Sequence, residues 1–516
     1  MERSRNALEE FDSLVLVSNR QPYRHRWGDG DVVVDQPTGG LTAALDPVLQ
    51  RVGGTWIAWG DGDADRTVVD DRNCVRVPPD DPSYTLRRVW LDEDTVDAYY
   101  EGFSNRVLWP LCHEFPEKVV SRVGDFEGYE AVNERFADCA AEHVDGETLI
   151  WLQDYHLALT PAGIDDRTPE STTIGQFWHI PWPTPDTFGV CPRSTELVDG
   201  LLGVDLLSFH VDRYVENFLD SVERFRPDAT VEKEAGRITH ERGETYVTAT
   251  PLGIDADRHA RESYAIAEGR HGRSGSDAFD ELGDERPAAS ATDCLDIPDC
   301  DVLCLGVDRL DYSKGIPARI EAVERLLERH PEWRESLVFV QTATPSRTTI
   351  PAYAEHGERV RQAVDRVNDR FRTDDWEPIV YTESYLARPV LVDLYRRADL
   401  MLVTPHLDGM NLVSKEFVAS SIDNTGALCL SEHAGASSQL GDLAYTVDPS
   451  DPDGISDTIH EALTACQAEQ SSRMRRLRQR VHERDIDWWM AQQFETLRWV
   501  ATRPQLSVTG PNAGDG

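Results

Sequence analysis

The sequence predicts an α/β protein with two doubly wound, Rossmann-like domains. Short apolar runs of strand length alternate with segments of helical apolar spacing, first over residues 13–254 and again over residues 301–484. A polar stretch at residues 268–299, rich in Gly, Ser, Asp and Ala, interrupts the alternation. The chain has 516 residues, 40% of them hydrophobic, which is enough for two domains that each bury a core.

The first half begins with a strand at residues 13–18. Further strands are predicted at residues 56–59, 149–152, 174–179, 206–210 and 246–250. Residues 36–45 lead through Gly39-Gly40 into a helix, and residues 92–108 have helical apolar spacing. The acidic loop at residues 61–65 (DGDAD) lacks the glycine and glutamate of a calcium loop at the sixth and twelfth positions, so a solvated turn is predicted there.

The second half repeats the alternation. Its strands are predicted at residues 302–307, 337–341, 379–381, 400–403, 428–430 and 444–447, and its helices at residues 314–329, 351–371, 389–397 and 409–421. The predicted domain order is a flexible arm (1–12), a first domain (13–254), a linker with a polar insertion (255–300), a second domain (301–484), a helix that packs back on the domain junction (485–502) and a disordered tail (503–516). Ligands bind at the carboxyl ends of such strands, so a shared site is expected in a cleft between the domains.

The charge is strongly negative and spread along the whole chain. Asp and Glu number 93 against 52 Lys and Arg, a formal net charge of −41. This charge excludes nucleic acid and anionic membranes as expected partners. Only Lys118, Lys233, Lys314 and Lys415 are lysines; every other basic residue among the 52 is arginine. Dispersed carboxylates and few lysines are typical of a protein from a high-salt cytoplasm, where salt screens self-repulsion; a GC-rich genome is the alternative cause of the lysine depletion.

The cysteines and the N-terminus indicate the compartment. Nine cysteines form no CxxC pair, and the polar N-terminal stretch predicts no signal peptide. No apolar run reaches membrane-spanning length. We therefore expect a cytoplasmic protein with reduced thiols, and no cluster in the sequence has the spacing of metal ligands. A homo-oligomer is compatible with these features.

Residues 404–417 (TPHLDGMNLVSKEF) form the first motif with a chemical meaning. A buried strand at 400–403 runs through the turn Leu407-Asp408-Gly409 into a helix, which places free backbone N–H groups and a helix dipole at one point. That point suits an anion such as a diphosphate, and Glu416 could accept hydrogen bonds from sugar hydroxyls. The alternative is an ordinary strand-to-helix crossover in which Asp408 is the N-cap.

Residues 308–315 (DRLDYSKG) form the second motif. Arg309 and Lys314 follow the first strand of the second half, where both could face a phosphate. The alternative is a pair of surface salt bridges. The lysine depletion favours the phosphate, because Lys314 and Lys415 are two of only four lysines and both lie in these motifs.

Eight motifs together resemble the trehalose-6-phosphate synthases, which are retaining glycosyltransferases of the GT-B fold. They are SNR (18–20), GGL (39–41), LWP (108–110), DYH (154–156), HIPWPTP (179–185), DRLDYSKG (308–315), TPSR (344–347) and DGMNLVSKE (408–416). Their order and spacing match the family from about residue 13 to residue 500. The resemblance implies transfer of glucose from a nucleotide-glucose, expected to be UDP-glucose, to glucose 6-phosphate with retention.

The resemblance also assigns the donor. The implied donor-binding residues are Gly40, His179, Arg309, Lys314, Asp408, Asn411, Leu412, Val413 and Glu416. Arg309, Lys314 and the backbone of 411–413 would hold the diphosphate, and Glu416 the ribose hydroxyls. Asp408 would hold hydroxyls of the transferred glucose, His179 the region of its 6-hydroxyl, and Gly40 would allow a close approach to the diphosphate.

The acceptor and the chemistry follow in the same way. The implied acceptor-binding residues are Arg20, Trp56, Tyr100, Trp109, Asp154 and Arg347, and the implied catalytic residues are Asp154, His179, Arg309, Lys314 and Asp408. A retaining transfer without an enzyme nucleophile can proceed by front-face attack, in which the leaving diphosphate takes the acceptor's proton. Such a reaction needs cations around the phosphates and two oriented sugars. No cofactor and no metal are implied.

Three residues depart from the family pattern. Leu407 replaces an arginine, Gln153 a histidine and Asp308 a glutamate, which leaves the acceptor and the nucleotide base open. A glucosylglycerol-phosphate synthase would share the fold but take a smaller acceptor; Tyr100, Trp109 and Arg347 favour a hexose phosphate. The sequence also leaves open a nucleotide-sugar 2-epimerase and a non-catalytic regulatory subunit. The subunit predicts eroded site residues, whereas all those implied above are present.

Overall fold

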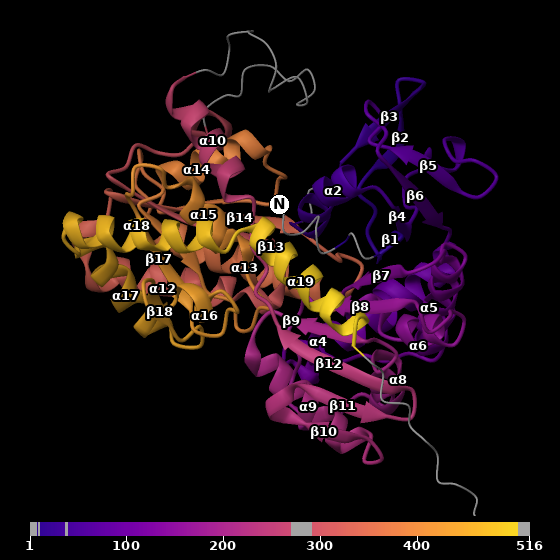
Figure 1. Ribbon diagram of the computed structural model, residues 1–516. Coiled ribbons are helices and arrows are strands. Elements are labelled where there is room, and N and C mark those ends of the chain that lie inside the picture. The colour runs from indigo at the N-terminus through magenta and orange to yellow at the C-terminus, as the bar shows by residue number, and fades with distance from the viewer. Residues whose placement is uncertain (1–7, 9–10, 37–39, 270–290, 504–516) are drawn as a thin grey trace, which may run out of the picture. The chain divides into compact units, whose positions relative to one another are not determined.

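A computed structural model describes residue 8 and residues 11–36, 40–269 and 291–503 (Figure 1). These residues form two compact units. The first runs to Pro251 and resumes at Asp487, and the second is Leu252–Ile486. The predicted arm and tail fall almost wholly outside the described residues, as does most of the predicted polar insertion.

The first unit is built on one ten-stranded sheet with the order β10-β11-β12-β9-β8-β7-β1-β4-β6-β5. Its strands are β1 (Ser13–Ser18), β4 (Thr55–Trp59), β5 (Cys74–Val77), β6 (Tyr84–Val89), β7 (Thr148–Gln153), β8 (Thr173–Phe177), β9 (Leu206–Phe209), β10 (Thr230–Glu232), β11 (Arg237–His240) and β12 (Gly243–Ala249). The strands from β12 to β6 pair in parallel, whereas β5 and β10–β11 add antiparallel edges. A separate hairpin is formed by β2 (Arg24–Gly28) and β3 (Asp31–Asp35).

Helices connect these strands and include one long π-helical segment. The α-helices are α2 (Gly40–Val52), α3 (Glu93–Val96), α4 (Trp109–Cys112), α5 (Asp125–Ala141), α6 (Thr160–Asp165), α7 (Pro185–Phe188), α8 (Ser194–Leu201) and α9 (Asp212–Phe225). The helix predicted at 92–108 begins as expected, because Asp92 caps the amide of Thr95, but Asp97–Leu108 is π-helical. Apolar spacing does not distinguish the two kinds of helix over so short a stretch.

The last helix, α19 (Ile486–Ala501), packs on the sheet of the first unit. Trp489 and Phe494 contact Trp151 of β7, with ring centroids 5.4 Å and 5.1 Å apart. Gly175 of β8 leaves room for Leu497, since a Cβ at Gly175 would lie 2.5 Å from Leu497 Cδ2. The helix therefore completes the core of the first unit; its predicted place at the domain junction stays a prediction.

The solvated turn predicted at residues 61–65 is correct for Asp63, which is exposed, but wrong for Asp65. Asp65 and Arg88 are both fully buried and form an ion pair of 3.0 Å. Asp65 also accepts hydrogen bonds from Gln21 Nε2 (2.6 Å) and the amide of His25 (2.8 Å). These bonds satisfy a carboxylate that burial would otherwise penalise, and they fix the segment that follows Arg20.

The second unit has a six-stranded, fully parallel sheet in the order β15-β14-β13-β16-β17-β18. Its strands are β13 (Val302–Leu310), β14 (Leu337–Pro345), β15 (Ile379–Thr382), β16 (Leu400–Val403), β17 (Ala427–Ser431) and β18 (Tyr445–Val447). This is the doubly wound order 3-2-1-4-5-6: the chain adds strands on one side of β13 up to β15 and then on the other side from β16 onward. The motif at 308–315 covers the end of β13 and the loop after it, and the motif at 404–417 follows β16, so both lie at the carboxyl edge where such sheets bind ligands.

Helices surround this sheet. They are α10 (Ala256–Ala267), α11 (Ala291–Leu295), α12 (Ile316–Arg329), α13 (Pro351–Phe371), α14 (Arg388–Arg397), α15 (Leu412–Ser420), α16 (Ser437–Leu440), α17 (Pro452–Thr464) and α18 (Gln467–Glu483) (Figure 1). Helix α10, in the stretch predicted to be a linker, is part of the second unit. Its Glu262 binds Arg388 of α14 at 2.8 Å, and its Ser263 donates to the carbonyl of Ser420.

Candidate active site

The loop after β13 is held against the loop after β16 by a glycine. Gly315 has φ +67°, and a Cβ there would lie 2.1 Å from the carbonyl oxygen of Thr404. The amide of His406 donates to the carbonyl of Ser313 (2.8 Å). Only glycine fits this approach of two backbones. As a result, Lys314 is brought to Asp408 from a distant part of the sequence.

Lys314, Asp408 and Asn411 form a polar group at this edge. Lys314 Nζ lies 2.6 Å from Asp408 Oδ2, and both side chains are largely buried, at 11% and 14% exposed. Asn411 Nδ2 donates to the same oxygen at 3.2 Å. The helix starts later than predicted: its N-cap is Asn411, with φ +75°, and not Asp408. Asn411 Oδ1 caps Ser414, which leaves the first-turn amides of Leu412 and Val413 directed away from the helix.

Arg309 and Arg347 lie on either side of one buried carboxylate. Asp311 is fully buried, and its Oδ2 is 3.8 Å from Arg309 and 3.5 Å from Arg347. Arg347 is 5% exposed and also donates to the hydroxyl of Tyr353 at 2.7 Å. Arg309 is 43% exposed, so its guanidinium can reach a ligand. Two guanidiniums and one carboxylate carry a net positive charge, so this group could bind a phosphate.

Glu416 lies in the second turn of α15, where its carboxylate accepts a hydrogen bond from Tyr395 (3.0 Å). Burial raises the pKa of Glu416, while the Tyr395 hydroxyl and the nearby Arg388 oppose that rise. Arg388 is itself fixed by Glu262. The carboxylate of Glu416 is therefore held in one orientation.

Arg319 is the main residue of this unit that the sequence did not single out. It is fully buried and donates to Asp308 Oδ2 (2.5 Å), Gln341 Oε1 (2.9 Å) and Thr404 Oγ1 (3.0 Å). It also donates to the carbonyl of Lys314 at 3.2 Å. One guanidinium thus joins β13, β14 and both ligand-facing loops. Asp308, where the family has a glutamate, is the anionic partner of this arginine.

Lys415 is the second such residue. It is 1% exposed and donates to the carbonyl of Leu252 (2.5 Å) and to Gln439 Oε1 (2.6 Å). Both acceptors are neutral, and burial lowers the pKa of Lys415 to about 7. Although it lies in the motif at 408–416, its amine is directed at these groups and not at Asp408.

The depressed pKa of Lys415 predicts a pH dependence of stability. In the unfolded chain its pKa returns to about 10.4, so between pH 7 and pH 9 the unfolded state binds more protons and the folded state gains stability as pH rises. Relative to Lys415→Met, the wild type should gain about 2 kcal/mol in free energy of unfolding over this window. Urea unfolding of both proteins at pH 7 and pH 9 measures it, and equal pH slopes would contradict it.

Asp154 and His179 are neighbours in the first unit. Asp154 follows β7 with φ +72°, and its Oδ1 accepts from the amide of His179 at 3.3 Å. Gln153 Oε1 lies 2.9 Å from His179 Nε2. Because an amide oxygen only accepts, Nε2 carries the proton and Nδ1 is left as an acceptor. Burial lowers the pKa of His179 to about 3, so the ring is neutral at physiological pH.

Arg20 and Tyr100 connect to this pair through His156. Arg20 Nη2 donates to the Tyr100 hydroxyl at 2.6 Å. The Tyr100 ring stacks on His156 with centroids 5.7 Å apart, and His156 Nδ1 is 3.9 Å from Asp154 Oδ2. Trp109 joins the same group, 5.9 Å from the ring of Tyr155. The structure thus brings together four of the five first-unit residues implied to bind the acceptor.

Trp56 is placed differently from the expectation. It is fully buried in β4, so it presents no surface to a ligand. Its Nε1 donates to Ser18 Oγ (2.8 Å), and Ser18 Oγ donates to the carbonyl of Arg20 (2.7 Å). Trp56 therefore supports the backbone of Arg20 through the hydroxyl of Ser18.

Gly40 is the first residue of α2, and residues 37–39 before it lie outside the described residues. The helix is fixed by Asp46, which accepts hydrogen bonds from the hydroxyls of Tyr23 (2.7 Å) and Tyr84 (2.5 Å). Burial raises the pKa of Asp46, and these two hydroxyls oppose the rise. The position of the start of α2 at Gly40 thus depends on Tyr23, which precedes β2, and on Tyr84 of β6.

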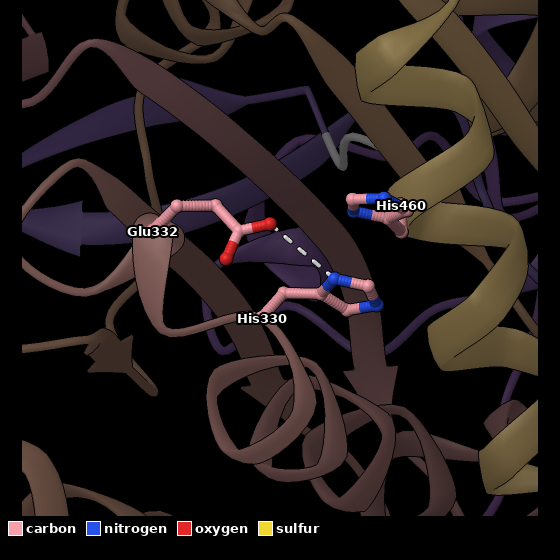
Figure 2. A group of neighbouring side chains, drawn as sticks. All are labelled: His330, Glu332 and His460. Carbon is pink, nitrogen blue, oxygen red and sulfur yellow. Dashed lines mark ion pairs between the residues drawn. The ribbon is translucent and has the colours of Figure 1, made fainter.

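Figure 2 shows a group that could be mistaken for a metal centre: His330, Glu332 and His460. The two imidazole rings are stacked, with centroids 3.6 Å apart and an interplanar angle of 13°. Their lone pairs therefore lie in nearly parallel planes and do not converge on one ion. His460 Nδ1 accepts from Trp333 Nε1 at 3.2 Å, and Glu332 lies 3.4 Å from His330 Nδ1. The group joins residues 330–333 to α17.

No helix in the described part of the chain is long and apolar enough to cross a membrane.

The chain matches the family model for glycosyltransferase family 20 over residues 12–266 and 299–498, which covers most of both units. The chain belongs to glycosyltransferase family 20. The GT-B fold expected from the motifs is confirmed by similar solved structures. The structure of an α,α-trehalose-phosphate synthase (UDP-forming) from Burkholderia vietnamiensis aligns over 95% of this chain and 100% of its own, with a TM-score of 0.79 and 31% identity.

Two curated relatives match nearly the whole of this chain but differ in how much of their own length is matched. It is 37% identical over 509 residues to the trehalose-6-phosphate synthase of Mycobacterium avium, which covers 96% of this chain and 97% of the relative. It is 36% identical over 487 residues to the bifunctional trehalose-6-phosphate synthase/phosphatase of Thermoproteus tenax, which covers 92% of this chain but 62% of the relative. The chain thus spans about three fifths of the bifunctional relative.

Proposed function

We propose that this protein transfers glucose from UDP-glucose to glucose 6-phosphate with retention and forms α,α-trehalose 6-phosphate. The observation that carries the proposal is the group at the carboxyl edge of β13 and β16. There Lys314 and Arg309 provide cations, the start of α15 provides amides, and Glu416 provides a fixed carboxylate. This combination suits the diphosphate and ribose of a nucleotide-sugar.

Related proteins support both substrates. A trehalose-6-phosphate protein from E. coli, 29% identical with a TM-score of 0.79 over 96% of this chain, is bound with UDP-2-fluoro glucose. An α,α-trehalose-phosphate synthase from Burkholderia xenovorans, 30% identical with a TM-score of 0.79 over 94% of this chain, is in complex with glucose 6-phosphate. The motif residues implied for both substrates are all present in this chain.

The proposed chemistry is a front-face substitution. The anomeric hydroxyl oxygen of glucose 6-phosphate bonds to C1 of the donor glucose as the bond from C1 to the β-phosphate oxygen breaks, and a phosphate oxygen of the departing UDP takes the proton. Arg309 and Lys314 stabilise the charge that develops on the leaving diphosphate. Asp408 is held by Lys314 and Asn411, so it can orient hydroxyls of the donor glucose. Asp154 and neutral His179 orient sugar hydroxyls from the first unit.

Acceptor dependence tests the proposal. UDP release from UDP-glucose should require glucose 6-phosphate and should be negligible with glycerol 3-phosphate or with no acceptor. Faster release with glycerol 3-phosphate would point to a glucosylglycerol-phosphate synthase. UDP release with no acceptor, accompanied by a free epimerised sugar, would point to an epimerase. Parallel assays with GDP-glucose and ADP-glucose identify the preferred base.

Mutations at the two proposed substrate sites should affect the binding of different substrates. Arg347→Ala should mainly raise KM for glucose 6-phosphate, and Glu416→Ala should mainly weaken UDP binding. Loss of a charge-assisted hydrogen bond should cost about 1.5–3 kcal/mol in each case. Isothermal titration with UDP and initial rates against both substrates measure the split. The assignment would be contradicted if both changes weakened UDP binding equally. The test is stringent because Arg347 shares Asp311 with Arg309, a residue assigned to the donor.

A high-salt cytoplasm is the proposed setting, supported by the net charge of −41 and by nine cysteines that are free thiols. Self-repulsion should make the fold weak in dilute buffer, and screening to about 3 Å at 1 M salt should stabilise it. The melting temperature should therefore rise between dilute buffer and molar KCl. A melting temperature that stays constant would remove the high-salt interpretation and leave the enzymatic one untouched.

A further inference from the structure

The chain enters the second unit at Leu252 and leaves it at Ile486, and these two connecting segments run side by side. The amide of Ile486 donates to the carbonyl of Ile254 at 3.0 Å. Gly253 allows this contact, because a Cβ there would lie 2.3 Å from the carbonyl oxygen of Asp485. The pair of segments at 252–254 and 484–486 is called the connection below.

Lys415 binds this connection to the helix that carries the donor residues. It belongs to α15, which begins with the amides of Leu412 and Val413, and it is adjacent to Glu416. Its Nζ donates to the carbonyl of Leu252 at 2.5 Å, the first residue of the connection. Moving this amine would cost free energy, because the carbonyl of Leu252 and Oε1 of Gln439 would each lose a buried hydrogen bond.

The second acceptor of Lys415 extends the link to the Asp408 loop. Gln439 lies on α16, next to residues 434–436. There the amide of Gly435 donates to the carbonyl of Asp408 (3.0 Å), and the amide of Ala436 donates to the carbonyl of Met410 (2.7 Å). Lys415 therefore lies at one point where α15, the support of the Asp408 loop and the connection meet.

We infer that Lys415 is a positioning residue for the nucleoside diphosphate, with which it makes no contact. It fixes the start of α15 to the connection. The positions of the donor-binding residues and the path of the connection therefore depend on each other. This inference rests on the proposed function. Coupling of this kind is reciprocal, so a change at the connection should alter UDP affinity as a change at Lys415 does.

The test compares UDP binding in three variants. Lys415→Met keeps the length and apolar stem but removes both hydrogen bonds. Gly253→Ala displaces the connection without changing any residue of α15. Asn368→Leu is the control, because Asn368 is buried in the same unit and exchanges two hydrogen bonds with Ile379, away from α15 and the connection. All three are measured well below their melting temperatures in molar KCl.

Lys415→Met and Gly253→Ala should each raise the Kd for UDP at least fivefold and raise KM for the donor, with KM for glucose 6-phosphate unchanged. Asn368→Leu should lower the melting temperature and leave the Kd for UDP within twofold. Wild-type Kd values in both Lys415→Met and Gly253→Ala would overturn the inference, and Gly253→Ala decides alone if Lys415→Met does not fold. A wild type that binds none of UDP, GDP and ADP would overturn the proposed function and this inference with it.

Discussion

Arg319→Met should destabilise the second unit by about 3–5 kcal/mol, the usual loss when one partner of a buried ion pair is removed. The guanidinium is fully buried, and its removal leaves Asp308, whose side chain is 4% exposed, without its cation. Gln341 and Thr404 would lose a donor in the same change. Urea unfolding of both proteins measures the difference in free energy.

The control lies on the same helix. Arg325 is 42% exposed and pairs with Glu321 and Glu328, so Arg325→Met should leave the free energy of unfolding close to that of the wild type. Adding Asp308→Asn to Arg319→Met should restore part of the loss, because it removes the unpaired charge. Equal destabilisation by Arg319→Met and Arg325→Met would show that Arg319 is not the residue that holds these loops.

Lys314→Met should lower kcat/KM about 10²–10³-fold, or roughly 3–4 kcal/mol, as removal of a group that stabilises transition-state charge commonly does. The change removes the cation nearest Asp408 and leaves that largely buried carboxylate without its partner. Lys314→Arg should lose at least about tenfold in kcat, since a planar guanidinium is wider than an ammonium and misplaces the groups around it. Steady-state rates with UDP-glucose and glucose 6-phosphate measure both effects.

Lys233→Arg is the matched control, because Lys233 lies in no motif and its side chain is 47% exposed beside Asp220 and Glu223. Its activity should be close to that of the wild type. Wild-type turnover in Lys314→Arg would show that Lys314 contributes charge alone, without a geometric requirement that arginine fails to meet.

Most strands of the two parallel cores were predicted from the sequence, including the sheet edges β15 and β18, whereas β6 and the antiparallel strands were not. The predicted bounds of β1, β16 and α13 coincide with those observed. Most strands of both parallel cores are continuous apolar runs, which is the pattern that sequence reasoning recognises, whereas β6 (YTLRRV) is not. By contrast, β10 and β11 are short and partly exposed, so they carry no such run. The hairpin β2–β3 was also missed: β3 contains the apolar run Val32–Val34, but the run is only three residues long and its side chains are exposed.

The site residues were predicted from motifs, but their supports were not. Asp408 is a residue type that commonly caps helices, yet the N-cap of α15 is Asn411. Asp408 is instead bound by Lys314 from another loop. Asp65 has the sequence context of a surface carboxylate, but it pairs with Arg88, 23 residues later. Arg319 and Lys415 likewise act through partners distant in sequence. Such pairings depend on tertiary packing, which local spacing does not encode.

The anomeric configuration and identity of the product test the central proposal most directly. Purified protein should be incubated with ¹³C-labelled UDP-glucose and glucose 6-phosphate in molar KCl, and the product examined by NMR. We expect one product, α,α-trehalose 6-phosphate, with the label in one α-linked ring and the phosphate on the other. A β-linked disaccharide, or labelled glucose recovered as free or epimerised sugar, would contradict the proposed retaining transfer to glucose 6-phosphate.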